Sequence, residues 1–249
     1  MVETTTSNLI TPIVRLTFCS LFSARMPSKT PKSGDRARYS TTALILPRDK
    51  YGPKDQERLD AMLKAGLEVG CSSELGKDRF VAMVKDGKIK ILRTDIESSG
   101  FPLEFKYFFR PWTFGIGARK AEGGQPAVLG APPGIVSEYK DPVTGKAIPI
   151  TDPNKVYSGC WARLSVKPFY TNYEKTNPAI SWNLSNVQIL AKPPEGYSAD
   201  RLDGKVDATD EFDATEEMAQ VDLAALTSGA PANGGAANDA DELARLLGG

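Results

Sequence analysis

Rings and positive charges alternate with apolar residues between Tyr157 and Tyr170. Successive side chains of an extended strand point to opposite faces. One face then carries Cys160, Ala162, Leu164 and Val166, and the other carries Trp161, Arg163, Ser165, Lys167 and Phe169. Because a flat ring stacks on a nucleobase and a cation meets a phosphate, the second face has the chemistry that unpaired nucleic acid needs. The alternative is an ordinary strand in which Trp161 packs beneath a loop while Arg163 and Lys167 are solvated.

Two further stretches combine rings with positive charges: the start of a strand expected over residues 38–46, and the aromatic-rich segment of residues 101–118. For any single ring a place in the core remains an alternative, because a domain of this size needs large apolar side chains inside. Taken together, the stretches give these candidates for contacts with a nucleic acid: Arg36, Arg38, Tyr39, Lys106, Tyr107, Arg110, Trp112, Trp161, Arg163, Lys167, Phe169, Tyr170 and Tyr173.

Positive and negative charges balance over the 249 residues but are separated along the chain. Residues 1–194 hold 28 Lys+Arg and 18 Asp+Glu, a net charge of +10. Residues 195–249 hold 3 Lys+Arg and 13 Asp+Glu, a net charge of −10. The basic body favours an anionic ligand, and the acidic segment behind it favours an interaction tail.

Several kinds of chemistry lack their residues. The chain has no histidine, which excludes Ser-His-Asp and Cys-His catalysis and Cys/His zinc sites. The cysteines, Cys19, Cys71 and Cys160, have no metal or redox spacing and are expected to be reduced thiols. Acidic residues of the body, such as Asp95 and Glu97, form no compact cluster of the kind that a two-metal nuclease needs. We therefore expect no enzymatic activity, no metal and no cofactor.

Hydrophobic periodicity predicts a mainly β domain. Strands are expected over residues 12–22, 38–46, 157–170 and 180–190, with one or two short ones within 79–92, and turns at 141–145 and 152–154. The clearest helix pattern covers residues 54–67, with a stop favoured near Gly66 and Gly70. Its apolar stripe consists of Leu59, Met62, Leu63 and Leu67. This pattern fits an OB fold best, a partly open five-stranded antiparallel barrel with an inserted helix.

The composition changes at residue 195, where Ala, Gly, Asp and Glu become dominant. Such a segment buries too little apolar surface to offset its ordering entropy. We expect a folded domain over residues 1–194 and a disordered acidic tail over 195–249. Residues 239–247 are the exception, because they fit a short helix. This helix supplies the candidates for binding a partner protein: Asp239, Asp241, Glu242, Leu243, Leu246 and Leu247.

The segment 157–163, with Tyr157, Gly159 and Cys160, and the segment 181–188, which ends Asn186-Val187-Gln188, resemble the C-terminal half of phage-encoded single-stranded DNA-binding proteins. These are related to the replication proteins of short-tailed coliphages. The resemblance covers about residues 12–192 and is most specific in 157–188. It implies an OB fold, cooperative binding of unpaired DNA and an acidic tail that touches replication partners. The coliphage tails end in an aromatic residue, whereas this chain ends in two glycines.

We therefore expect a protein that binds unpaired DNA without sequence preference, for phage DNA replication or recombination. Expected protein partners are a phage DNA polymerase, helicase or recombination protein, reached through the tail. The alternative is a structural or regulatory module that uses the same barrel to bind protein. No apolar run approaches 18 residues and no signal peptide is evident. The expected location is the cytoplasm of the infected host cell.

Overall fold

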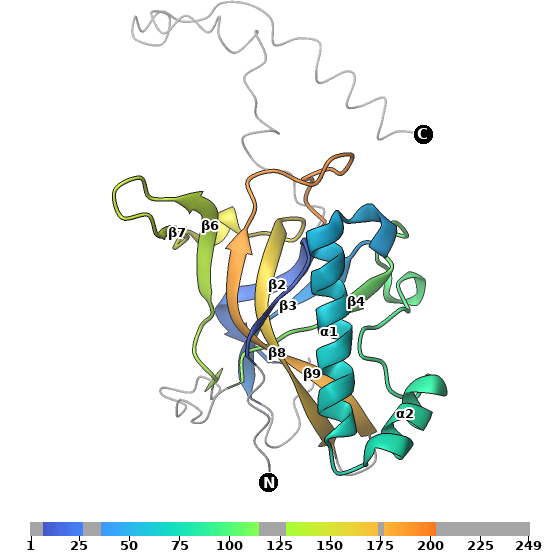
Figure 1. The fold of residues 1–249 in the computed structure, drawn as a ribbon. Coiled ribbons are helices and arrows are strands. Elements are labelled where there is room, and N and C mark those ends of the chain that lie inside the picture. Colours follow the sequence, from blue (N-terminus) through green and yellow to red (C-terminus); the bar gives the residue numbers. More distant parts are fainter. Residues whose placement is uncertain (1–6, 27–35, 115–127, 174–176, 203–249) are drawn as a thin grey trace, which may run out of the picture. The chain divides into compact units, whose positions relative to one another are not determined.

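One sheet of nine strands runs through the part of the chain that the structure describes, residues 7–26, 36–114, 128–173 and 177–202 (Figure 1). The structure is a computed structural model, and these residues all fall within one compact unit, Met1–Lys205. The strands are β1 (Leu9–Ile10), β2 (Val14–Arg25), β3 (Ala37–Ile45), β4 (Tyr107–Phe109), β5 (Val128–Leu129), β6 (Gly134–Lys140), β7 (Ala147–Pro149), β8 (Trp161–Tyr173) and β9 (Asn177–Ile189). Their order is β4-β3-β2-β8-β9-β6-β7, with β1 beside β8 and β5 beside β3.

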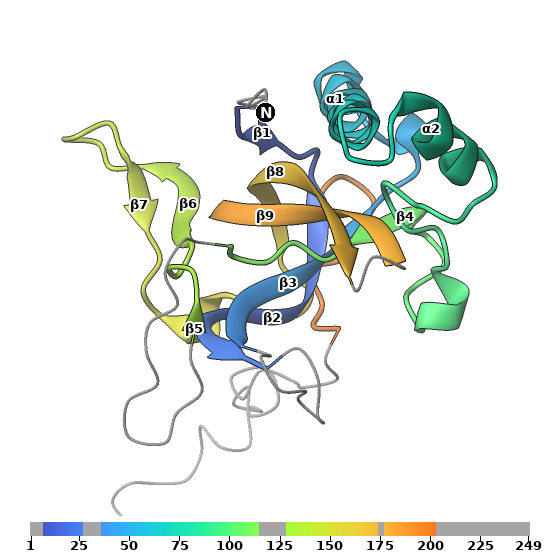
Figure 2. The same ribbon diagram turned by 90° about the horizontal axis from the view of Figure 1, so that it is seen from below.

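A short segment after β4 closes the sheet on itself. Backbone hydrogen bonds join Thr113 N to Tyr39 O of β3 (2.9 Å) and Trp112 N to Trp182 O of β9 (3.1 Å). Seen from below, this green segment passes between β3 and β9 (Figure 2). Strands β2, β3, β8 and β9 and residues 111–113 therefore form a five-membered barrel. The expected mainly β, OB-type barrel with an inserted helix is confirmed, although the sheet has more strands and includes two parallel pairs, β3–β5 and β6–β9.

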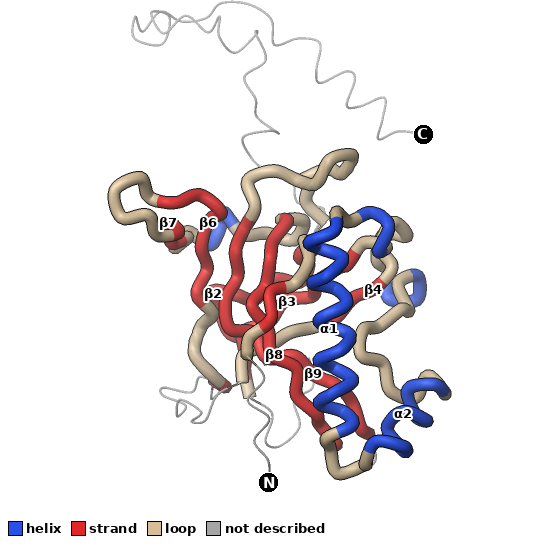
Figure 3. The backbone as a smooth tube through the Cα atoms, in the orientation of Figure 1, coloured by secondary structure: helices blue, strands red, loops and turns tan. Residues whose placement is uncertain are grey.

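Two α-helices, α1 (Pro53–Cys71) and α2 (Lys77–Lys85), are inserted between β3 and β4. Three short 3₁₀ helices cover Arg48–Lys50, Glu97–Ser99 and Pro153–Lys155. Figure 3 shows α1 running along the strands, with α2 beyond its end. Neither α1 nor α2 has the length and apolar composition needed to cross a bilayer, and no other helix of the described residues does.

Helix α1 is longer than the sequence pattern predicts, because its glycines are contact positions. A Cβ atom at Gly66 would collide with the Ile91 side chain, and one at Gly70 would collide with the Phe80 ring. Both glycines thus let neighbouring side chains approach the helix axis closely. The expected core residues Leu59 and Met62 are buried, at 1% and 0% exposure.

The prediction of one or two short strands within residues 79–92 is wrong. Residues 77–85 form α2, which buries Phe80 against α1, and the predicted break at residues 86–87 is the turn that follows the helix. The Phe80 ring packs into the space that the missing side chain of Gly70 leaves on α1, and this contact favours a helix over strands. The hydrophobic periodicity of so short a segment does not reveal such a contact. The turns at 141–145 and 152–154 are confirmed, each with an aspartate that accepts backbone N–H bonds.

The apolar face of β8 is confirmed as core. Ala162, Leu164 and Val166 are all fully buried, and Cys160 just before the strand is 6% exposed. Burial raises the pKa of the Cys160 thiol, which favours its neutral form.

Residues 195–202, here called the closing segment, lie against the start of β8. Leu202 N donates to Ser158 O at 2.7 Å, and Tyr157 Oη donates to Ala199 O at 3.2 Å. Gly159, at φ +124°, is required here because a Cβ atom would collide with Asp200 O. The predicted division of the chain at residue 194 stays a prediction, but the packed chain continues to Leu202. The predicted disorder of the rest of the tail lies outside the described residues.

Candidate nucleic-acid interface

Three rings meet on the outer surface where residues 111–113 join β9. Trp112, Phe114 and Phe169 are here called the aromatic cluster. The Phe114 and Phe169 rings are stacked, with centroids 5.5 Å apart and planes inclined by 28°. The Trp112 ring lies edge-on to both, at 5.7 Å and 5.5 Å. Since Phe114 is 53% exposed, the cluster presents apolar ring surface to solvent.

Backbone hydrogen bonds fix the cluster to the barrel. Trp112 donates to Trp182 O and accepts from Leu184 N at 2.9 Å. Phe114 N donates to Asn183 Oδ1 at 2.8 Å. Trp112 and Phe114 are therefore held to β9, and the intervening Thr113 is held to β3.

Positive charges surround the aromatic cluster. The Arg38 guanidinium lies 4.6 Å from the Trp112 ring centroid, a cation–π contact. Lys167 precedes Phe169 by two residues on β8, so the two side chains lie on the same face of the strand. Lys167 pairs in the sheet with Asn183 of β9, whose side chain accepts from Phe114 N. Arg110 follows β4 and is exposed. Part of the Arg110 side chain is nevertheless covered, and this burial, followed by repulsion from Arg93, lowers the pKa of Arg110, while Asp95 acts in the opposite direction.

A hollow of about 370 Å³ continues from the cluster across β3 and β2. Its walls include Arg25, Arg38, Arg110, Trp112 and Phe18. The rest of its described lining consists of Met26, Ser20, Ser40, Thr41 and Thr42, and no carboxylate is among these residues. Rings, hydroxyls and three guanidinium groups suit a polyanion that carries flat rings.

Trp161 is not on this surface. The ring is 2% exposed and packs against Phe105 and Tyr197, and its Nε1 donates to Ser198 O at 2.8 Å. The expectation of a solvent-facing stacking ring is therefore wrong. The strand face on which it lies is covered at this end by the closing segment, so the alternative, a ring packed beneath a loop, is what the structure shows.

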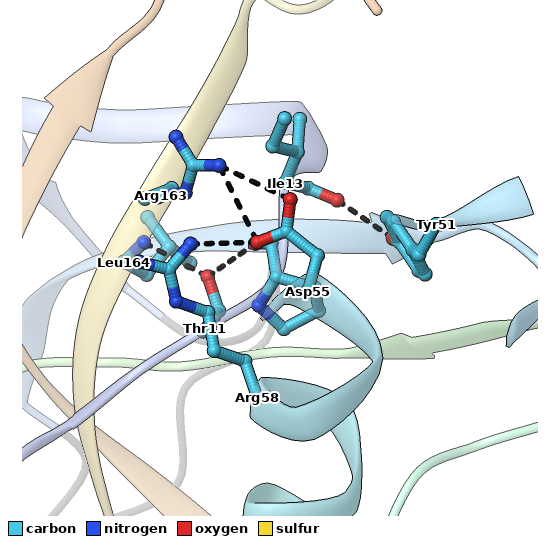
Figure 4. A network of polar contacts seen from close by, with 8 residues as sticks. Thr11, Ile13, Tyr51, Asp55, Arg58, Arg163 and Leu164 are labelled. Carbon is cyan, nitrogen blue, oxygen red and sulfur yellow. Dashed lines mark hydrogen bonds and ion pairs between the residues drawn. The ribbon is translucent and has the colours of Figure 1, made fainter. Parts of the chain in front are cut away.

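Arg163 faces α1 and not solvent. Its Nη2 lies 3.1 Å from Asp55 Oδ2, and Asp55 also accepts from Arg58 at 2.6 Å (Figure 4). In the same network Leu164 N donates to Thr11 Oγ1. Arg163 is thus paired within the protein, with a carboxylate that it shares with Arg58, contrary to the expectation of a cation that meets phosphate. This ion pair ties the start of α1 to β8.

Tyr51 completes the polar network shown in Figure 4. Its hydroxyl donates to Ile13 O at 2.7 Å and accepts from Leu46 N at 3.0 Å. Burial raises the pKa of this phenol well above its usual range. The network therefore serves to hold helix and strands together, and its polar groups are not available to a ligand.

The remaining predicted residues fall into four groups. Tyr170 pairs with Ile180, on the opposite strand face from Phe169, and burial raises the pKa of its phenol. Lys106 and Tyr107 lie at β4 opposite Ile45, away from the aromatic cluster along β3. Arg36 is exposed just before β3 and Tyr39 is half-buried next to Arg38. The side chain of Tyr173 and the six tail candidates, Asp239, Asp241, Glu242, Leu243, Leu246 and Leu247, lie outside what the structure describes.

Of the thirteen predicted residues, Arg38, Arg110, Trp112, Lys167 and Phe169 come together at one surface. Sequence reasoning missed Phe114, Phe18 and Arg25. Alternation from Trp112 puts Phe114 on the same side, so that signal was available. Phe18 follows Val14 and Leu16 in strict alternation, which predicts a core position; a bulge in β2 turns it outwards.

The described residues contain no group of three or more His, Cys, Asp and Glu side chains that could hold a metal ion.

Residues 130–223 match the model of a protein family described as Enterobacter phage Enc34, ssDNA-binding protein. The match includes β6, β8 and β9 and the residues 157–188 that carry the sequence resemblance, so the resemblance to phage-encoded single-stranded DNA-binding proteins is confirmed. No curated protein matches the sequence.

Solved structures of two phage proteins are similar to the chain. The single-stranded DNA-binding protein from bacteriophage Enc34 in complex with ssDNA has 16% identity and a TM-score of 0.48, over 76% of this chain and 90% of that chain. The single-stranded DNA-binding protein gp2.5 encoded by bacteriophage T7 has 12% identity and a TM-score of 0.41, over 81% and 95%.

Proposed function

We propose, from the premise that residues 130–223 match a family of phage single-stranded DNA-binding proteins, that this protein binds unpaired DNA. The observation that carries the proposal is the aromatic cluster with the Arg38 guanidinium over the Trp112 ring. Exposed rings stack on bases of any sequence, and the cations around them neutralise the backbone phosphates. Nothing in this mechanism breaks a bond, so the protein acts by binding alone, and labelled DNA is expected to stay intact in the presence of Mg²⁺.

The biological setting that fits this activity is replication or recombination of phage DNA in the cytoplasm of the infected host cell. Phage polymerases, helicases and recombination proteins are the partners expected for the acidic tail. The alternative of a barrel that binds only protein predicts no retention on immobilised unpaired DNA.

Preference for unpaired over duplex DNA is the first expected result. Bases stacked inside a duplex cannot reach the rings, whereas phosphate contacts exist in both forms. Fluorescence anisotropy of labelled oligonucleotides should show much tighter binding of the unpaired strand. Its affinity should fall with salt at a log-log slope of about −0.7 for each phosphate neutralised. Equal affinity for both forms at both low and high salt would contradict the proposal.

Removal of the acidic tail is expected to tighten binding at low salt. Residues 203–249 hold 11 Asp+Glu and 2 Lys+Arg, and a tethered polyanion competes with DNA at high effective concentration. The truncation has to follow Leu202, because a cut at residue 195 would also remove the closing segment from Trp161.

Screening reduces this competition, since the Debye length falls to about 8 Å at physiological salt. The gain on truncation should therefore shrink as salt is added. Full-length and truncated protein are compared by anisotropy at both salt concentrations. Identical affinities at low salt would leave the tail with a role in solubility or in partner binding only.

A further inference from the structure

Phe18 stands out from β2 in a conformation that a non-glycine residue rarely adopts. Its φ is +51°, in the left-handed region, and its ring is 66% exposed. The register of β2 against β3 explains why the ring points outwards: Thr17 pairs with Thr42, Ser20 pairs with Ser40, and a bulge lies between the two pairs. Such strain and such apolar exposure both cost free energy, and bulges that re-aim a side chain occur beside functional sites.

Two hollows share Phe18 as a wall. The first is the hollow of about 370 Å³ beside the aromatic cluster. The second, of about 400 Å³, is here called the Tyr157 hollow, and it lies between the β2 bulge, residues 153–158 and the end of the closing segment. Phe18, Ser20 and Arg25 line both. Each has the size of a site for a small ligand, about 300–1,000 Å³.

The Tyr157 hollow repeats the chemistry of the aromatic cluster. The Arg201 guanidinium lies 4.6 Å from the Tyr157 ring centroid, the same distance that separates the Arg38 guanidinium from the Trp112 ring centroid. The phenol itself is held by its hydrogen bond to Ala199 O. None of the described residues that line the Tyr157 hollow is a carboxylate, and two arginines, Arg25 and Arg201, are among them. This hollow is therefore built for an anion with a flat ring.

We propose that the Tyr157 hollow is a second nucleotide subsite and that the unpaired strand crosses β2 over Phe18 to reach it. This rests on the proposed function. The Phe18 ring stacks between a base in the first hollow and a base in the second, and Arg25 meets the phosphate that joins them. The strand thus runs from the aromatic cluster across β3 and β2 towards residues 153–158.

Substitution at Phe18 tests the crossing. Phe18→Ala and Phe18→Gly both remove the ring, and the glycine variant also relieves the left-handed backbone, so a folded protein without the ring is available. Affinities are measured by anisotropy for oligothymidylates of increasing length. Each variant should lose about five- to 150-fold in affinity for long oligothymidylates, with a smaller loss for the shortest ones. Phe18→Tyr, which keeps a stacking ring, should restore binding.

Tyr139→Ala is the matched control, because Tyr139 is 57% exposed on β6 and lines neither hollow. It should leave affinity unchanged at every length. If Phe18→Gly binds like the wild type at all lengths while Phe114→Ala weakens binding, the second subsite is overturned and the proposed function stands. If the wild type itself does not prefer unpaired DNA, both are overturned.

Discussion

Trp161→Ala is expected to lower the free energy of unfolding by about 3–5 kcal/mol, the range for a large buried ring cut back to alanine. The ring is 2% exposed and lies between Phe105 and Tyr197. Its Nε1 donates to Ser198 O at 2.8 Å, and the Arg15 guanidinium lies 5.6 Å from its centroid. The substitution thus opens a cavity and removes a hydrogen bond that holds the closing segment.

Urea unfolding followed by circular dichroism measures this effect. Trp112→Ala is the matched control, because Trp112 is half-buried and should cost less stability but more affinity for unpaired DNA. A Trp161→Ala variant that unfolds like the wild type while losing DNA affinity would return Trp161 to the role of a stacking ring.

The second large effect concerns the rings that face solvent. Replacing Phe114 and Phe169 together by alanine should weaken binding of unpaired DNA by about 2–6 kcal/mol, if each ring stacks one base. Because the two rings stack on each other at 5.5 Å, the single substitutions are not expected to add up to the double one. Neither ring belongs to the buried core, since Phe114 is 53% exposed and Phe169 is half-buried, so the double variant should remain folded.

A control pair of exposed side chains with apolar surface is available on the β6–β7 hairpin. Tyr139 and Val143 are 57% and 90% exposed, far above the core residues, and neither lines a described hollow next to the aromatic cluster. Tyr139→Ala with Val143→Ala should leave DNA affinity unchanged in the same anisotropy titration. Equal losses in the two double variants would mean that exposed apolar surface, and not this cluster, supports binding.

The inner face of the barrel was predictable because strand alternation is a local rule. Ala162, Leu164 and Val166 follow it and are fully buried. Alternation does not tell whether the opposite face is covered, and Trp161 is covered by residues about forty positions later in the chain. A single strand pattern therefore cannot separate a stacking ring from a ring beneath a loop.

Contacts between residues far apart in the chain also explain why the length of α1 and part of the site could not be predicted from the sequence. Gly66 and Gly70 read as helix stops, yet they continue α1 because Ile91 and Phe80 occupy the space of their missing side chains. Trp112 was predictable as part of the aromatic-rich segment of residues 101–118. Phe18 was not, because one bulge reverses the face of the residues after it.

Tryptophan fluorescence tests the central claim, that unpaired DNA lies on the Trp112 face. The chain has three tryptophans, and Trp161 and Trp182 are each only 2% exposed. Bases stacked on the barrel should therefore quench Trp112 alone. Unpaired DNA is expected to quench the wild type and Trp182→Phe, whereas Trp112→Phe should lose the quenching and still bind by anisotropy. Undiminished quenching in Trp112→Phe would place the DNA elsewhere and contradict the account.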